Sequence, residues 1–94
     1  MKLVKEAEKL VNKDRQAEYG SAHDNYGTAE LLTETIEIVH SRTKDKPMSA
    51  SKRGLWFMLF TKIARVVCGK PKRDSFVDMI GYIILIAREY GVKE

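Results

Sequence analysis

Two cationic side chains interrupt an otherwise apolar segment in the second half of the chain. Between Gly54 and Cys68 the only charged residues are Lys62 and Arg65, three positions apart, so they project from one face of a helix. A charge in apolar surroundings must be paired or must face a polar cavity. These cations therefore either form a structural ion pair or bind an anion such as phosphate, for which arginine offers a bidentate fork.

The next apolar segment carries a matching set of polar side chains. Asp74, Asp78 and Tyr82 recur every fourth residue, so they also share one helix face. Two interpretations stay open. In the first, Asp78 pairs with Lys62 or Arg65 across a helix interface and has no further role. In the second, the aspartates hold a divalent metal or bind a ribose or a base, and Tyr82 stacks on the base.

A third set of side chains with chemical potential lies nearer the N-terminus. Arg15 and Tyr19 are one helical turn apart and are expected to reach the same cavity, with Asn25 following shortly after. Glu34 and Glu37 form an E-x-x-E pattern that places two carboxylates on one helix face. Such a pair holds a metal in some proteins and is more often simply solvated.

Helical spacing of apolar residues indicates the elements that position these groups, and no segment alternates like a strand. The first helix is expected over residues 2–18, ended by Gly20 in a left-handed conformation. Ser21 and Asp24 form a capping box for a second helix over residues 22–41. The residues of this helix expected to face inward are Tyr26, Ala29, Leu32, Ile36 and Val39.

Two further helices follow a polar loop over residues 42–47. The third is capped by Ser49 or Ser51 and ends near Gly69. The fourth is capped by Asp74 or Ser75, continues to Tyr90 and stops at Gly91. Short connections between four helices predict a compact, antiparallel, all-α four-helix bundle.

The whole chain, residues 1–94, is expected to form one helical domain. Its last two helices are apolar on almost every side, and two remaining helices cannot cover them, so we expect a homo-oligomer. The net charge of +4 does not by itself indicate nucleic-acid binding, and no helix has a basic polar face for a groove. The N-terminus lacks the apolar core of a signal peptide, and no apolar run could span a bilayer, which predicts a cytoplasmic protein.

Three motifs carry a resemblance to known families. The segments DRQAEYG at residues 14–20, KIAR at residues 62–65 and DSFVDMIGY at residues 74–82 together resemble a family of small phage proteins of unassigned function. The last segment is also similar to the closing helix of the MazG-like, all-α nucleoside triphosphate pyrophosphohydrolases. That resemblance implies Mg²⁺ held by E-x-x-E and E-x-x-D motifs.

The sequence departs from the pyrophosphohydrolase pattern at its second motif. The position three residues before Asp78 is Ser75, and the available acid, Asp74, lies four residues before it. Magnesium-dependent hydrolysis would therefore depend on Glu34, Glu37, Asp74 and Asp78. Cations and aromatic residues without a full set of metal ligands favour binding without turnover, and binding alone needs no cofactor.

The leading hypothesis is a phage-type protein, in the host cytoplasm, that sequesters a nucleotide or cyclic-nucleotide immune signal without cleaving it. Lys62, Arg65 and Arg15 are expected to contact phosphate. The base and ribose are expected to meet Tyr19, Asn25, Asp78 and Tyr82. Two alternatives stay open, a magnesium-dependent nucleoside triphosphate pyrophosphohydrolase and an adaptor whose apolar helices bind a host protein.

Overall fold

The computed structural model describes residues 1–10 and 15–93, and every regular element in these residues is helical. The all-α class predicted from the sequence is confirmed there. The helices are α1 (Lys2–Lys9), α2 (Arg15–Tyr19), α3 (Ala22–Lys44), α4 (Ala50–Cys68) and α5 (Arg73–Glu89). The single first helix predicted over residues 2–18 includes residues 11–14, which lie outside the described part, and α1 and α2 lie on either side of them.

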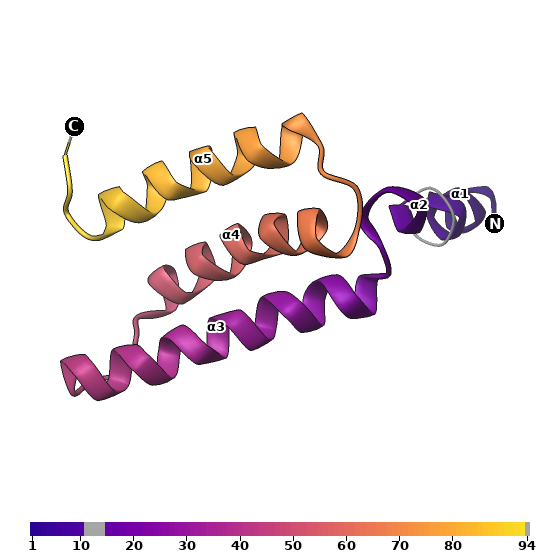
Figure 1. Ribbon diagram of the computed structural model, residues 1–94. Coiled ribbons are helices and arrows are strands. Elements are labelled where there is room, and N and C mark those ends of the chain that lie inside the picture. Colours follow the sequence, from indigo (N-terminus) through magenta and orange to yellow (C-terminus); the bar gives the residue numbers. More distant parts are fainter. Residues whose placement is uncertain (11–14, 94) are drawn as a thin grey trace.

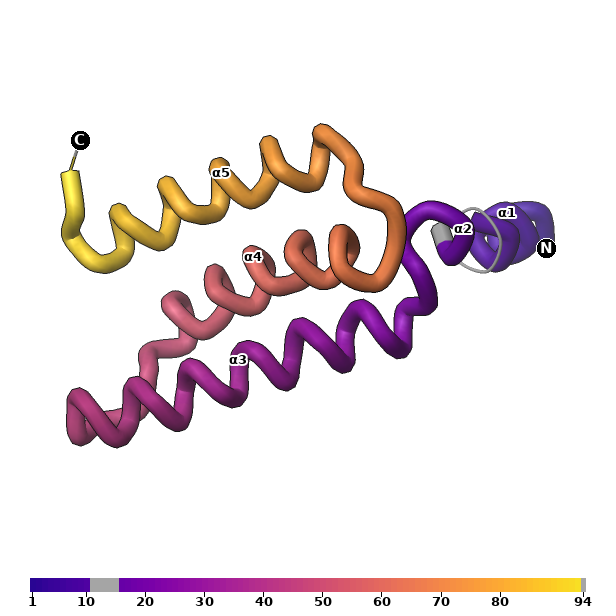
Figure 2. The backbone as a smooth tube through the Cα atoms, in the orientation of Figure 1, coloured from indigo at the N-terminus to yellow at the C-terminus, as the bar shows by residue number. Residues whose placement is uncertain are grey.

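The three long helices form one antiparallel layer with α4 in the middle (Figure 1, Figure 2). Both α3 and α5 pack along α4, and α2 meets α4 at one end of the layer. The N-terminal helix α1 lies beyond this end, where none of its residues is buried. The expected fourth bundle helix therefore does not lie along the other three, because α1 presents only a narrow apolar stripe on a charged segment. The described chain is elongated, with extents of 48 × 28 × 26 Å.

Small side chains make the closest contact in this layer. Asn25, Ala29 and Thr33 recur at every fourth residue on the buried face of α3, and Ala29 and Thr33 are fully buried. The predicted inward position of Ala29 is confirmed. Those of Tyr26 and Val39 are wrong, since these side chains are 53% and 50% exposed. Small residues let two helix backbones approach closely, which moves bulky neighbours to the flanks of the contact.

The ends of α3 follow local signals that the sequence already contains. Gly20 has a φ of +82°, and the Ser21 hydroxyl oxygen accepts a hydrogen bond of 3.0 Å from the Asp24 amide. This side-chain cap was predicted. At the other end α3 continues to Lys44, beyond the predicted end at residue 41, and stops where Asp45 adopts a left-handed conformation with φ of 55°.

The predicted cap of α4 is confirmed, whereas the predicted caps of α5 are wrong. Ser49 caps α4, accepting a hydrogen bond of 3.3 Å from the Lys52 amide. For α5 the predicted caps at Asp74 or Ser75 are wrong, because the helix already begins at Arg73 and Lys72 stands at its cap without a side-chain hydrogen bond.

The C-terminal end of α5 and the lengths of the helices complete the fold. The last helix stops as predicted, with Gly91 at φ of 76°. None of the helices in the described residues is long and apolar enough to cross a membrane.

Candidate functional site

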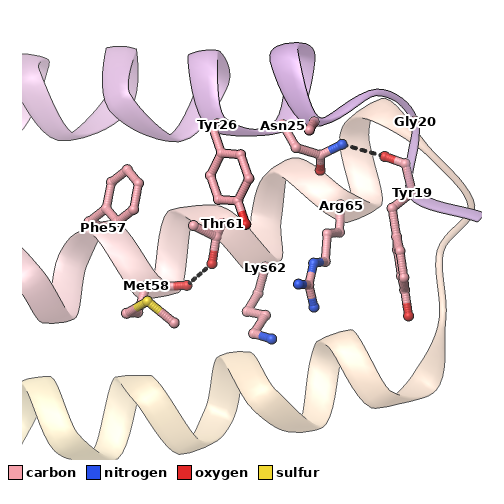
Figure 3. Close-up of a pocket in the computed structure, with 10 residues that line it drawn as sticks. Tyr19, Gly20, Asn25, Tyr26, Phe57, Met58, Thr61, Lys62 and Arg65 are labelled. Carbon is pink, nitrogen blue, oxygen red and sulfur yellow. Dashed lines mark hydrogen bonds between the residues drawn. The ribbon is translucent and has the colours of Figure 1, made fainter. Parts of the chain in front are cut away.

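A pocket opens where the turn between α2 and α3 meets the last turns of α4 (Figure 3). Its cavity volume is about 190 Å³. Pockets that enclose a whole drug-sized ligand usually reach about 300 Å³ or more, so this cavity fits one end of a larger molecule. Its lining combines aromatic, apolar and cationic side chains: Tyr19, Gly20, Ala22, Asn25, Tyr26, Phe57, Met58, Thr61, Lys62 and Arg65.

A close backbone approach builds the wall of the pocket. A Cβ atom added to Gly20 would lie 2.7 Å from the Cys68 carbonyl oxygen, and one added to Gly69 would overlap the backbone of Tyr19. Only glycine at both positions lets the α2–α3 turn touch the end of α4. This contact places Tyr19 directly beside α4.

The loop between α4 and α5 holds the same junction from the other side. The Lys70 amide donates a hydrogen bond of 2.7 Å to the Glu18 carbonyl oxygen, and the Lys72 ammonium lies 2.7 Å from the Glu18 carboxylate. The hydrogen bond and then the charge of Lys72 lower the pKa of Glu18 below its usual value. The pocket is therefore framed by α2, α3, α4 and the following loop.

Lys62 is one of the two cations in the pocket, and it is already paired. Its ammonium lies 3.2 Å from the Asp78 carboxylate of α5, and its side chain is only 13% exposed. The structure thus contains the ion pair between Lys62 and Asp78 that was one of the two interpretations. An ammonium has three N–H donors, so Lys62 can bind a second acceptor while it is paired with Asp78. Asp78 itself does not line the pocket.

Arg65 is the second cation, and its guanidinium lies over the ring of Tyr19, 5.0 Å from the ring centre. This is a cation–π contact. Within the described residues no carboxylate forms an ion pair with Arg65. Figure 3 shows Arg65, Lys62 and Tyr19 projecting to the same side of α4. The guanidinium therefore has donors available to an incoming anion.

Asn25 lies in the first turn of α3 and also lines the pocket, and one of its polar atoms has no partner. Its amide nitrogen donates hydrogen bonds to the carbonyl oxygens of Tyr19 at 2.6 Å and Ser21 at 2.8 Å. Its side-chain oxygen is buried and has no hydrogen-bond partner. The residue as a whole is only 8% exposed. Buried acceptors are nearly always satisfied. The unsatisfied oxygen is thus suited to a donor supplied by a ligand.

Four of the seven predicted ligand-binding residues come together in this pocket: Tyr19, Asn25, Lys62 and Arg65. Arg15 is the first residue of α2, and its side chain lies outside the described part. Tyr82 is partly buried on α5 and does not line the pocket. Asp78 contacts Lys62 but does not itself line the pocket. The helix α5 therefore supplies none of the lining residues.

Several lining residues were not predicted from the sequence, although the positions of two of them, Met58 and Tyr26, point to the pocket. Met58 lies four residues before Lys62 and seven before Arg65, so helical spacing places all three on one face. Tyr26 follows Asn25 directly but was predicted to be a core residue. Its ring lies in the pocket because the small residues of α3 occupy the contact with α4.

The four carboxylates that the magnesium-dependent alternative requires do not form one site within the chain. Glu34 and Glu37 belong to α3, whereas Asp74 and Asp78 belong to α5 on the other side of α4. Among the described residues, no group of three or more His, Cys, Asp or Glu side chains could hold a metal ion. Both helices that carry these residues were predicted apart from their exact ends, but the layer separates their acidic side chains.

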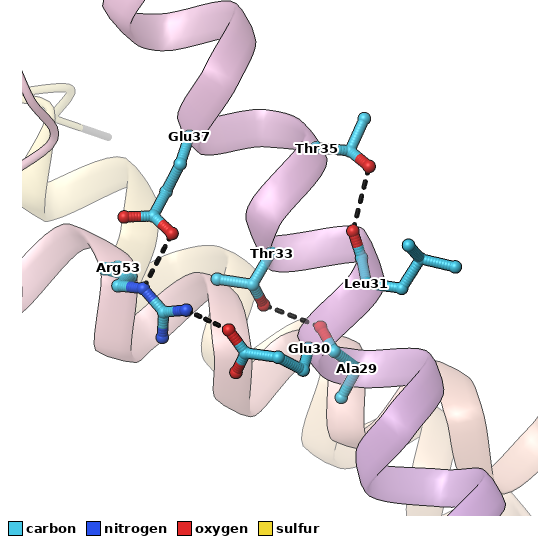
Figure 4. Close-up of polar contacts among 7 residues, drawn as sticks. All are labelled: Ala29, Glu30, Leu31, Thr33, Thr35, Glu37 and Arg53. Carbon is cyan, nitrogen blue, oxygen red and sulfur yellow. Dashed lines mark hydrogen bonds and ion pairs between the residues drawn. The ribbon is translucent and has the colours of Figure 1, made fainter.

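Glu37 has a structural partner instead (Figure 4). Its carboxylate accepts a hydrogen bond of 2.8 Å from the Nε of Arg53, which also pairs with Glu30. The hydrogen bond to Glu37 is the largest cause, followed by the one to Glu30, and together they raise the pKa of Arg53. One member of the E-x-x-E pair therefore links α3 to α4, and Glu34 stays exposed.

Comparison with known proteins gives a family and one phage relative. The chain is 31% identical over 88 residues to the Gene 55 protein of Mycobacterium phage D29, an alignment that covers 94% of this chain and 53% of that protein. It thus spans about half the length of this relative. No solved structure matches the chain. Residues 2–90 match the family described as "Domain of unknown function (DUF6378)", and the chain belongs to this family.

Proposed function

We propose that the chain binds a nucleotide or a cyclic nucleotide, without cleaving it, in the pocket between the α2–α3 turn and α4. The observation that carries the proposal is Arg65, a cation without an acidic partner among the described residues, held against the Tyr19 ring. A phosphate accepts hydrogen bonds from guanidinium in a bidentate geometry. The ring keeps the guanidinium oriented toward the cavity.

The charge of the pocket favours an anionic ligand. Lys62 and Arg65 supply two positive charges, and the Asp78 carboxylate, which is 47% exposed, offsets one of them. The remaining walls are largely apolar and aromatic. In such surroundings a charge-assisted hydrogen bond is stronger than it is in open water.

The other side of the pocket suits the sugar or the base. Tyr19, Tyr26 and Phe57 offer aromatic surface, on which a base can stack. The free oxygen of Asn25 accepts from a hydroxyl or an amino group. Since the cavity of about 190 Å³ holds one end of such a ligand, the remainder extends past the rim.

The phage origin of the matched relative supports the role proposed for this binding, which is to sequester a nucleotide immune signal in the host cytoplasm. The separation of the acidic residues of α3 from those of α5 supports binding without turnover. The magnesium-dependent pyrophosphohydrolase stays an alternative hypothesis. It predicts release of pyrophosphate that stops in Asp78→Asn.

Isothermal titration calorimetry with nucleoside mono-, di- and triphosphates and with cyclic mono- and dinucleotides tests the proposal. We expect at least one of them to bind, and Arg65→Gln to weaken its binding about 10- to 100-fold, the value of one hydrogen bond to a charged group. Arg88→Gln on α5 removes the same charge from an exposed position away from the pocket and should leave the affinity unchanged.

Two results would contradict the proposed function. The first is the absence of binding by every compound in the panel. The second is an equal loss of affinity in Arg65→Gln and Arg88→Gln, which would mean that net charge rather than the pocket attracts the ligand. Incubation of the same compounds with Mg²⁺, followed by chromatography of the products, separates binding from hydrolysis.

A further inference from the structure

A continuous apolar surface covers the side of α4 and α5 opposite the pocket. On each helix its members recur at spacings of three, four or seven residues, which is the seam that helical bundles bury. We call this surface the apolar face, and it consists of Trp56, Phe60, Ile63, Val67, Phe76, Ile80, Ile83 and Tyr90.

Aromatic contacts join the two rows of residues at one end. The Trp56 ring stacks on Phe60 with centres 5.8 Å apart, and it meets the edge of Tyr90 at 6.5 Å. The helices α4 and α5 are antiparallel (Figure 1). Val67, near the end of α4, and Phe76, near the start of α5, therefore lie at the opposite end. The two rows therefore run side by side along the whole layer.

The apolar face and the pocket point in opposite directions. Successive residues of a helix are rotated by about 100°, so Phe60 and Val67 lie on the side of α4 away from Lys62 and Arg65. The Lys62–Asp78 ion pair likewise marks the pocket side of α5. The eight members of the apolar face are uncharged, and the Lys52 ammonium lies at its edge, 4.4 Å from the centre of the Tyr90 ring.

Much of the apolar face is open to solvent in a single chain. The exposed fractions are 72% for Val67, 59% for Ile80 and 53% for Ile83, with Phe76 at 48% and Tyr90 at 44%. Isolated exposed apolar residues are common on protein surfaces, but a contiguous and uncharged row of them marks an interface.

The total exposed surface is large enough to include such an interface. The chain exposes 6965 Å², whereas a compact monomer of 10.8 kDa exposes about 5,500 Å². Its radius of gyration is 15.6 Å, against about 12 Å for a compact domain of this length. Part of the excess belongs to α1, which stands beyond the layer. An interface of standard size uses only about 800 Å² of each partner, a little over half of the excess.

We propose that the apolar face is the interface of a symmetric homodimer, in which α4 and α5 of two copies form a four-helix bundle. A two-fold axis brings the same patch of both copies together. An uncharged apolar patch is complementary to itself, and two antiparallel pairs of helices complete the bundle that one chain leaves open. In this dimer the two pockets face outward and stay accessible, so the dimer does not depend on the proposed function.

Sedimentation equilibrium on the full chain, over roughly a hundredfold range of concentration, tests the proposal. We expect twice the chain mass for the unaltered protein and the chain mass for Val67→Glu and Ile80→Glu. Both side chains are more than half exposed, so a glutamate is solvated in the separated chain, and circular dichroism should show unchanged helix content. The matched control is Leu31→Glu on α3, where a leucine is 65% exposed outside the apolar face, and it should stay dimeric.

Three outcomes would overturn the homodimer. A monomeric unaltered chain is the first, including a compact one in which α1 folds over the apolar face. The second is loss of dimers in Leu31→Glu with dimers retained in Val67→Glu and Ile80→Glu, which would move the interface to α3. The third is a stoichiometric host protein, rather than a second copy, retained on the apolar face after purification, as the adaptor hypothesis requires.

Discussion

Replacement of Gly20 by alanine should destabilise the protein through the junction that frames the pocket. Gly20 has a φ of +82°, and a Cβ atom there would lie 2.7 Å from the Cys68 carbonyl oxygen. The left-handed conformation costs a residue with a side chain about 1–2 kcal/mol. The overlap is with backbone, which no change of rotamer relieves, and adds a cost similar to overpacking, about 1–3 kcal/mol.

The two terms together predict a loss of about 2–5 kcal/mol, and each kcal/mol lowers the melting temperature of a domain of this size by about 4–8 °C. Thermal unfolding followed by circular dichroism measures it, at one fixed protein concentration because association shifts the melting temperature. Binding should also weaken in Gly20→Ala, since Tyr19 and Asn25 move with the turn.

Gly54→Ala is a matched control with the opposite sign. Gly54 lies within α4, and a Cβ atom there meets nothing within 4 Å, so alanine should stabilise the helix by about 0.5–1 kcal/mol. The melting temperature should rise by about 2–8 °C. If Gly20→Ala melts at or above the temperature of the unaltered chain, the close approach of the α2–α3 turn to α4 is refuted.

Three further predictions concern the stability of the layer. Ser21→Ala removes the cap of α3 and should cost about 1 kcal/mol in urea unfolding, whereas an unchanged midpoint would show that the cap is dispensable. Ala64→Leu adds bulk at a fully buried position of α4 and should cost about 1–3 kcal/mol by the same measurement; a stabilised variant would mean that the helices are not in close contact. Lys72 lowers the pKa of Glu18, so the stability from this pair is present above the ordinary value of 4.5 and is lost as the pH falls through the lower folded value. Glu18→Gln should therefore make unfolding less dependent on pH in this acidic range, most clearly at low salt, and an unchanged pH profile would count against the ion pair.

The helices and most of their ends were predictable because they depend on local interactions. The apolar period, the cap at Ser21 and the left-handed glycines at Gly20 and Gly91 act over a few residues, and all are visible in the sequence. The errors at the start of α5 and the end of α3 are also local. They arise where several polar residues compete for the same cap.

The grouping of Lys62 with Arg65 was predictable for the same reason, since spacing along one helix fixes a shared face. The partner of each cation was not. The sequence allowed Asp78 to pair with either of them, and the packing of α5 on α4 selects Lys62. That selection leaves Arg65 against Tyr19, a contact that depends on two glycines meeting across the fold.

The amino-acid sequence by itself determined that this protein is helical, where most of its helices begin and end, and that two apolar helices carry a few charges. Tertiary structure alone decided that α3 and α5 lie on opposite sides of α4, which separates Glu34 and Glu37 from Asp74 and Asp78. Helix periods specify which side of each helix is apolar but not which helix it meets. That choice depends on the fit of side chains such as Ala29, Thr33 and Ala64 over long separations in the chain.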